Sequence, residues 1–142
     1  MKLRLLIAIC VLLIPASSFA GEKEIDQLAL IAAQQARCMG AILDSFESKE
    51  EEEIAYSKFY KSLVKYNRQI VEYALKQDRG LSKILEAVGS VDILVGMTMQ
   101  GFIISADEYN KQYNKEREGK SLAEFHKFLW DVNGCEAIYS SM

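Results

Sequence analysis

The sequence has very little proline and histidine. Its 142 residues include one of each, Pro15 and His126. Because proline interrupts helices, its absence after Pro15 leaves the rest of the chain free to form long helices. With a single histidine the chain cannot form a His-Glu-x-x-His zinc site, and only His126 is available to a catalytic triad.

Sequence motifs that carry chemistry are missing as well. The chain has no Gly-x-Ser-x-Gly elbow, no glycine-rich phosphate loop and no Cys-x-x-Cys pair. We therefore expect no catalytic residues, no cofactor and no metal site. A hydrolase that uses two carboxylates is the remaining enzymatic alternative, because the chain has 20 acidic residues, but no pattern nominates two of them.

The beginning of the chain has the three parts of a secretory signal peptide. Lys2 and Arg4 supply the positive start, residues 5–14 are apolar, and Ser18 and Ala20 are the small residues that precede a cleavage site. We predict that residues 1–20 are the signal peptide and that residues 21–142 form a single domain in the periplasm or outside the cell. The short cationic start and the absence of an Asn-x-Ser/Thr sequon favour a bacterial periplasm.

The charge of the chain argues against nucleic acid as a partner. Removing Lys2 and Arg4 with the signal peptide changes the formal net charge from −3 to −5, whereas phosphate binding requires clustered cations. The most apolar later stretch, residues 91–106, contains Asp92 and Gln100 and is too short to span a bilayer. We expect no stable insertion into a membrane after cleavage.

Two of the three cysteines follow the predicted cleavage site. Cys10 would be removed with the signal peptide, so Cys38 and Cys135 would remain together in an oxidising compartment. We predict that they form a disulfide, which would link the first helix of the domain to its end. On the chain-entropy model, closing a loop of about 100 residues contributes about 4.7 kcal/mol to stability. The bond would therefore matter to a small domain outside the cytosol.

Apolar residues recur every three or four positions after the signal peptide. This pattern predicts an all-α fold, arranged as an antiparallel bundle of four main helices with a short connecting helix. The main helices are expected at residues 24–47, 49–77, 91–115 and 122–133, and the short helix at residues 81–88. Capping boxes are predicted where Ser48 precedes Glu51 and where Ser121 precedes Glu124.

Several polar residues are placed to point into the bundle. Gln35, Asn67 and His126 fall on the apolar sides of their predicted helices, and Thr98 and Ser105 lie on the helix that would meet them. Two interpretations remain open. The five residues form a hydrogen-bond network that fixes the register of the helices, or they line a small pocket, since bundle cores hold ligand sites.

Two glycines interrupt the apolar helix at residues 91–115. Inside a helix, Gly96 and Gly101 each cost about 1 kcal/mol relative to alanine. The pattern predicts that another backbone packs closely against them, and a ligand lying against them is the alternative.

The helix at residues 49–77 has an aromatic side and a cationic side. The aromatic side supplies core residues or a site for a lipid or an aromatic ligand, and consists of Tyr56, Phe59, Tyr60, Tyr66 and Tyr73. The cationic stripe is either an ordinary solvated face or a patch for an acidic partner, and consists of Lys58, Lys61, Lys65 and Arg68.

These features predict a non-enzymatic protein that acts by binding another protein. An inhibitor, an immunity-type factor or an envelope accessory factor would fit export, small size, disulfide bracing and the lack of a catalytic set. The alternative is a periplasmic carrier that holds a small molecule or a lipid in the bundle core.

Overall fold

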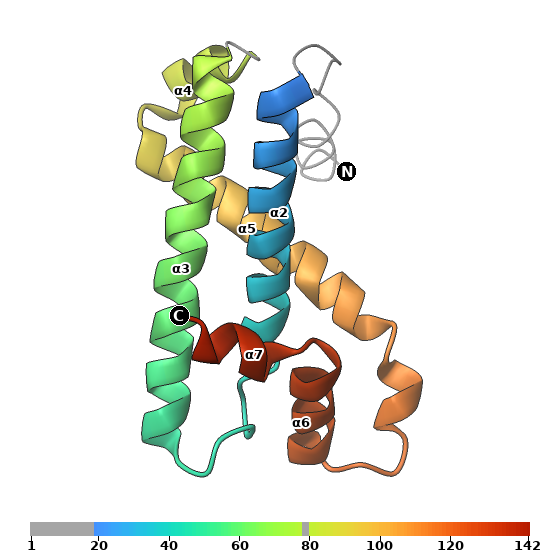
Figure 1. The fold of residues 1–142 in the computed structure, drawn as a ribbon. Helices are drawn as coiled ribbons and strands as arrows, with labels where there is room; N and C mark the ends of the chain where they lie inside the picture. Colours follow the sequence, from blue (N-terminus) through green and yellow to red (C-terminus); the bar gives the residue numbers. More distant parts are fainter. Residues whose placement is uncertain (1–18, 78–79) are drawn as a thin grey trace.

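The computed structural model describes residues 19–77 and 80–142 (Figure 1). These residues form six α-helices and a short 3-10 helix, and they include no strand. The predicted all-α class is therefore confirmed. Residues 1–18 of the predicted signal peptide, including Cys10, lie outside the described residues, and cleavage after Ala20 stays a prediction.

Six α-helices and one 3-10 helix follow one another along the described chain. In order they are α2 (Phe19–Met39), α3 (Lys49–Lys76), α4 (Leu81–Val88), α5 (Val91–Lys111), η1 (Asn114–Arg117), α6 (Leu122–Val132) and α7 (Cys135–Ser140).

The first long helix ends earlier than its apolar pattern predicts. α2 stops at Met39 instead of continuing to residue 47. Asp44 then takes a φ of 58°, in the left-handed region, and its N–H donates to Oε1 of Glu52 at 2.5 Å. Ile42 is nevertheless buried. The loop after α2 buries its apolar residues in the core. Their spacing in the sequence is therefore the same as that of a continuing helix.

The end of the chain also differs from the prediction. α5 stops at Lys111, and the chain continues through the 3-10 helix η1. Gly134, with a φ of 64°, ends α6 and begins the additional helix α7, which starts at Cys135. Glycine adopts this left-handed conformation without the strain that a Cβ would cause.

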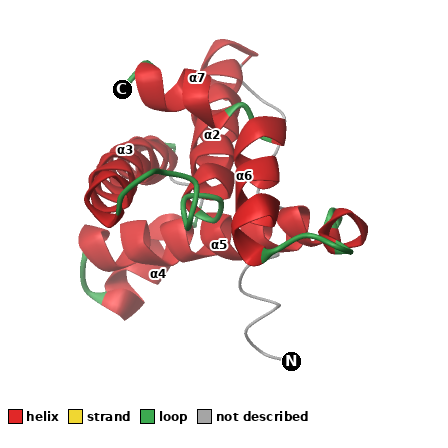
Figure 2. Ribbon diagram, turned by 90° about the horizontal axis from the view of Figure 1, so that it is seen from below, coloured by secondary structure: helices red, strands yellow, loops and turns green. Residues whose placement is uncertain are grey.

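Three long helices form the centre of the fold. α2 and α3 lie side by side and antiparallel, and α5 crosses them obliquely (Figures 1 and 2). α6 contacts mainly η1 and α7, and α7 in turn contacts α2 and α3. The predicted antiparallel bundle of four main helices is not confirmed, because the short helix α6 does not pack along the three long ones.

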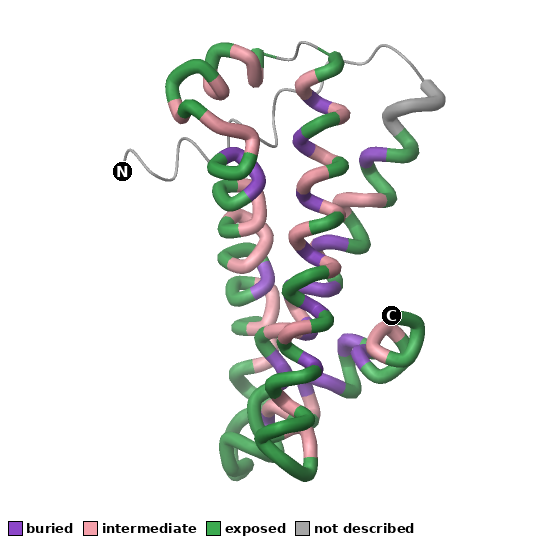
Figure 3. Tube along the Cα trace, turned by 90° about the vertical axis from the view of Figure 1, so that its left-hand side faces the viewer, coloured by how far each residue is buried: buried purple, intermediate pink, exposed green. Residues whose placement is uncertain are grey.

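Buried residues form three clusters along these helices (Figure 3). The cluster near the disulfide contains Phe59 and Trp130, and the cluster next to α4 is built on apolar residues such as Val71. The middle cluster consists of Ala32, Ala36, Leu63 and Ala106. Short alanine side chains let helix axes approach closely, which explains how α5 crosses α2 in the middle of the fold.

Serine residues begin three of the helices. The capping box at Ser121 is complete, with the Ser121 hydroxyl accepting from the Glu124 N–H and the Glu124 carboxylate accepting from the Ser121 N–H. Ser48 accepts from the Glu51 N–H at 3.2 Å, but the described contacts do not include the return bond from Glu51. Ser90 caps α5 in the same one-sided way.

Candidate functional site

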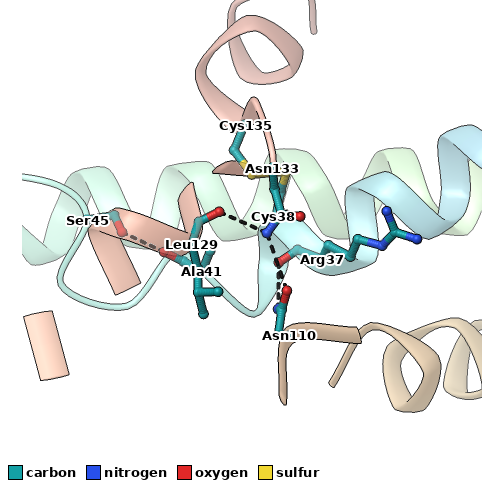
Figure 4. The surroundings of a disulfide bond; sticks show 8 residues. All are labelled: Arg37, Cys38, Ala41, Ser45, Asn110, Leu129, Asn133 and Cys135. Atoms are coloured by element: carbon teal, nitrogen blue, oxygen red, sulfur yellow. Dashed lines mark hydrogen bonds between the residues drawn. A yellow bond between two sulfur atoms is a disulfide. The ribbon is translucent and has the colours of Figure 1, made fainter. Parts of the chain in front are cut away.

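The disulfide joins the end of α2 to the start of α7 (Figure 4). The Cα atoms of Cys38 and Cys135 are 5.5 Å apart, and both residues are fully buried. The two cysteines are 97 residues apart in the sequence, so the bond closes a long loop of the chain. It therefore ties the C-terminal helices to the end of α2, beside the apolar cluster that contains Phe59 and Trp130.

A chain of asparagine side chains lies beside this disulfide (Figure 4). Asn133 Nδ2 donates to the Leu129 carbonyl at 2.8 Å and to Asn110 Oδ1 at 3.3 Å. Asn110 Nδ2 donates to the Arg37 carbonyl at 3.4 Å. The ends of α2, α5 and α6 are thereby linked by two side chains that no sequence pattern indicated. Asn110 follows the charged residues Asp107 and Glu108, and Asn133 lies just after the last residue of α6.

An open cleft of about 620 Å³, which we call the lysine cleft, lies between α2, α3 and the C-terminal segment. Three cations from α3 stand along it, with polar and apolar residues around them. Its lining residues are Ile31, Gln34, Gln35, Lys58, Lys61, Ser62, Lys65, Tyr66, Ile138, Ser141 and Met142.

A second open cleft, of about 630 Å³, lies between α2, α5, η1 and α6 and is called here the histidine cleft. His126 lines it, and its Nδ1 atom is buried without a hydrogen-bond partner among the described residues. Polar neighbours in the same lining include Asp107, Asn110, Lys111 and Arg117. Both charge signs meet here, in contrast with the lysine cleft.

The five inward polar residues are not gathered into one pocket. Gln35 lines the lysine cleft and His126 the histidine cleft, while neither lining includes Asn67, Thr98 or Ser105. Ser105 is exposed, because the oblique crossing of α5 turns that side of the helix away from the core. The predicted convergence on one site is therefore not present in these two clefts.

Local hydrogen bonds satisfy only part of this polar set. Asn67 is fully buried and its Nδ2 donates to the Leu63 carbonyl at 2.8 Å, one turn earlier. Thr98 bonds to the Leu94 carbonyl in the same way at 2.9 Å. Oδ1 of Asn67 is buried without a donor among the described residues. A complete network that fixes helix register is thus absent as well.

The outer face of α5 carries Gly96 and Gly101. A Cβ atom built on either glycine would meet no atom within 4 Å outside the backbone of its own helix. Within the described chain, therefore, no other backbone packs closely against these glycines. The reason is the orientation of α5, which turns Leu94 and Val95 into the core and Ile93 and Met97 outward.

Ion pairs neutralise cations elsewhere on the surface. Lys111 Nζ lies 2.7 Å from Asp107 Oδ2 and 3.2 Å from Glu108 Oε1, and the pKa of Lys111 is raised, chiefly by its hydrogen bond with Asp107. Arg68 pairs with Asp92 at the start of α5, and its pKa is raised by that hydrogen bond. Among the stripe residues of α3, Arg68 is therefore in an ion pair, whereas no carboxylate of the described residues pairs with Lys58, Lys61 or Lys65.

Residues 19–77 and 80–142 contain no group of metal-ligating side chains and no single helix that could span a membrane. No three His, Cys, Asp or Glu side chains in this part of the chain are grouped so that they could hold a metal ion. No single helix in it has the length and apolar character of a membrane span, although α4 and α5 pass that test jointly as a pair bent by 110°.

Comparison of the chain with protein-family models, with curated proteins and with solved structures found no significant match.

Proposed function

We propose that the protein is exported and acts by binding another protein, with the outer face of α5 as the binding surface. Three large apolar side chains are exposed on this face, with Ile93 at 50%, Met97 at 44% and Ile104 at 37% of their full accessible surface. Gly96 and Gly101 lie beside them and leave the helix backbone open. This apolar and open face is the observation that carries the proposal.

The inner face of α5 is apolar as well, because Leu94, Val95 and Ala106 are buried against the rest of the fold. Gln100 is the exposed polar residue among the three apolar side chains of the outer face. A helix that is apolar on most of its sides is normally covered by neighbours, whereas within the described chain Ile93, Met97 and Ile104 stay partly open to solvent. An amphipathic helix of a partner protein would bury Ile93, Met97 and Ile104, and the glycines would let its backbone come close.

Two further observations support export. The start of the chain has the pattern of a signal peptide, and a fully buried disulfide is typical of proteins from oxidising compartments. The mass of the protein recovered from its native compartment tests this part of the proposal. A chain that begins at Gly21 and has no free thiol is expected. A chain that retains residues 1–20 in the cytosol would contradict it.

Site-specific crosslinking in cells tests the binding surface. A photoreactive residue in place of Met97 should give one discrete adduct with another protein, and the same residue in place of the exposed Lys83 of α4 should not. Gly96→Leu should abolish the Met97 adduct by filling the open backbone, whereas Ala87→Leu adds similar bulk to α4 and should leave it intact. Equal adducts at both positions would contradict the proposal, as would an adduct of twice the protein's own mass.

The alternative prediction, a carrier with its ligand inside the bundle core, gains no support from the five polar residues. Gln35 and His126 lie in different clefts, and both clefts are open to solvent. A ligand would bind at the surface of the fold.

A further inference from the structure

The lysine cleft concentrates positive charge on an acidic protein. Lys58, Lys61 and Lys65 all line it, although the whole chain carries a formal net charge of −3. No carboxylate of the described residues lies within 4.0 Å of any of these three amino groups. The α2 side contributes only Ile31, Gln34 and Gln35, so no acid lines that wall.

The sequence around the three lysines differs from that of an ordinary solvated face. On such a face, acids usually stand three or four residues from lysines and pair with them along the helix. Here the positions three and four residues away hold no acid, and Lys61 and Lys65 are themselves four residues apart. Like charges at this spacing destabilise a helix, and a bound anion would relieve the repulsion.

A buried polar group without a partner lies at the base of the cleft. Gln35 is 3% exposed, and its Nε2 donates to Ser62 Oγ at 2.9 Å. Oε1 of Gln35 has no donor among the described residues. Rotating the amide would pair Oε1 with the serine hydroxyl and leave Nε2 unpaired, so one atom of the amide lacks a partner either way. Because Oε1 has no surface open to the cleft, the Gln35 side chain would turn towards the cleft to accept a hydrogen bond from a ligand hydroxyl that lies beside the anionic group.

Apolar side chains flank the cations. Ile31 and Met142 line the cleft and remain 37% and 41% exposed, and Ile138 and the ring of Tyr66 complete this apolar lining. Lys58 Nζ lies 4.4 Å from the ring centroid of Tyr139, which keeps this cation at the end of the cleft near α7. An apolar chain of a ligand would cover these exposed surfaces.

We infer that the lysine cleft binds an amphipathic carboxylate, with the carboxylate on Lys58, Lys61 and Lys65, a neighbouring hydroxyl on Gln35, and the acyl chain on Ile31, Ile138 and Met142. The cleft has a volume of about 620 Å³ and is open to solvent, so a bound acid would remain partly exposed. No residue of α5 lines it. The inference is therefore independent of the protein partner proposed for the outer face of α5.

Titration calorimetry on the disulfide-bonded protein tests this inference with four probes: 3-hydroxydecanoate, decanoate, decanol and inorganic phosphate. The two acids should bind saturably at one site, and 3-hydroxydecanoate should bind about threefold or more tightly than decanoate because of the hydrogen bond to Gln35. Binding of decanol as tight as that of decanoate would show that the lysines contribute nothing. Binding of phosphate as tight as that of the acids would show a site for free anions. Either result, or no saturable binding of the acids, would overturn the inference.

Matched variants locate the site. Lys61→Gln should weaken the binding of both acids about tenfold or more, since a charge-assisted hydrogen bond is lost. Lys83→Gln makes the same charge change on α4 and should leave both affinities within about twofold of the original. Equal losses in the two variants would overturn the inference.

The role of Gln35 is tested separately by the difference in affinity between 3-hydroxydecanoate and decanoate. Gln35→Met should equalise the affinities for decanoate and 3-hydroxydecanoate without weakening the binding of decanoate. Ser62→Ala removes the hydroxyl that accepts from the Gln35 amide, and it replaces Gln35→Met if that variant fails to fold. It should also reduce the preference for 3-hydroxydecanoate over decanoate. A hydroxyl preference that survives in both variants would overturn the assignment of Gln35.

Discussion

Asn133 donates a hydrogen bond to Asn110, 23 residues earlier in the chain, across 3.3 Å. The pair ties the end of α6 to the end of α5, and Asn110 passes the connection on to the backbone of α2 through the Arg37 carbonyl. Because Asn133 is only 8% exposed, its amide has little access to water. The pair supplements the disulfide and the apolar cluster around Phe59 and Trp130 at this end of the fold.

We expect Asn133→Ala to lower the free energy of unfolding by about 1 to 3 kcal/mol, since buried hydrogen bonds are lost. Asn110→Ala should cost about 1 kcal/mol. Denaturant unfolding of both single variants and the double variant should give a coupling energy of at least about 0.5 kcal/mol. Asn114→Ala removes an exposed asparagine near Asn110 and is the control. Strict additivity of the two buried substitutions would show that the pair contributes no coupling.

Removing the disulfide should destabilise the domain strongly. The double substitution of Cys38 and Cys135 by alanine is expected to lower the free energy of unfolding by about 2 to 5 kcal/mol. The loss should appear equally when the original protein is unfolded in the presence of a reductant. Cys10→Ala is the control, because Cys10 lies in the segment that we predict to be removed. A loss below about 1 kcal/mol would show that helix packing alone holds α7 in place.

The helical class and most helix starts could be predicted from the sequence, because caps and apolar spacing are local signals. Ser48 and Ser121 mark helix starts that the structure reproduces. The end of α2 could not be predicted, since Ile42 is buried from a loop and keeps the helical spacing. The short helix α7 follows a left-handed glycine, Gly134, and its six residues are too few to show a periodicity.

The arrangement of the helices in space was harder to predict from the sequence. The spacing of apolar residues tells which side of a helix is buried but not the angle at which it crosses its neighbours. The oblique path of α5 exposes Ser105 and Gly96 and leaves no atom close to Gly101, although we expected all three to be inside. Without the crossing angles, the sequence also could not show that Gln35 and His126 lie in different clefts. The lysine cleft likewise depends on where α7 ends beside α3.

Acid should weaken the start of α6. Hydrogen bonds from the Ser121 backbone and hydroxyl lower the pKa of Glu124 below its ordinary value. The folded state therefore favours the carboxylate, so its contribution to stability is present above the unfolded pKa and is lost as the pH falls through the lower folded pKa. Unfolding measured from about pH 6 to about pH 3 should show the difference between the original protein and Glu124→Gln shrinking towards zero. Glu86→Gln on α4 is the control. A difference that does not change with pH would contradict this role of Glu124.

Replacing the outward glycines of α5 by alanine should raise the stability of the protein and weaken the binding of a partner. Gly96→Ala and Gly101→Ala should each raise the free energy of unfolding by up to about 1 kcal/mol, because alanine is the better helix former and the new methyl group meets no atom within 4 Å. Gly89→Ala should instead lower it, since Gly89 ends α4 with a φ of 83° that strains any Cβ. If a partner helix packs closely on α5, the two stabilised variants should nevertheless give weaker Met97 crosslinks than the original protein. Increased stability with unchanged crosslinking would show that the glycines serve no close approach, and the partner would then have to bind through the apolar side chains alone.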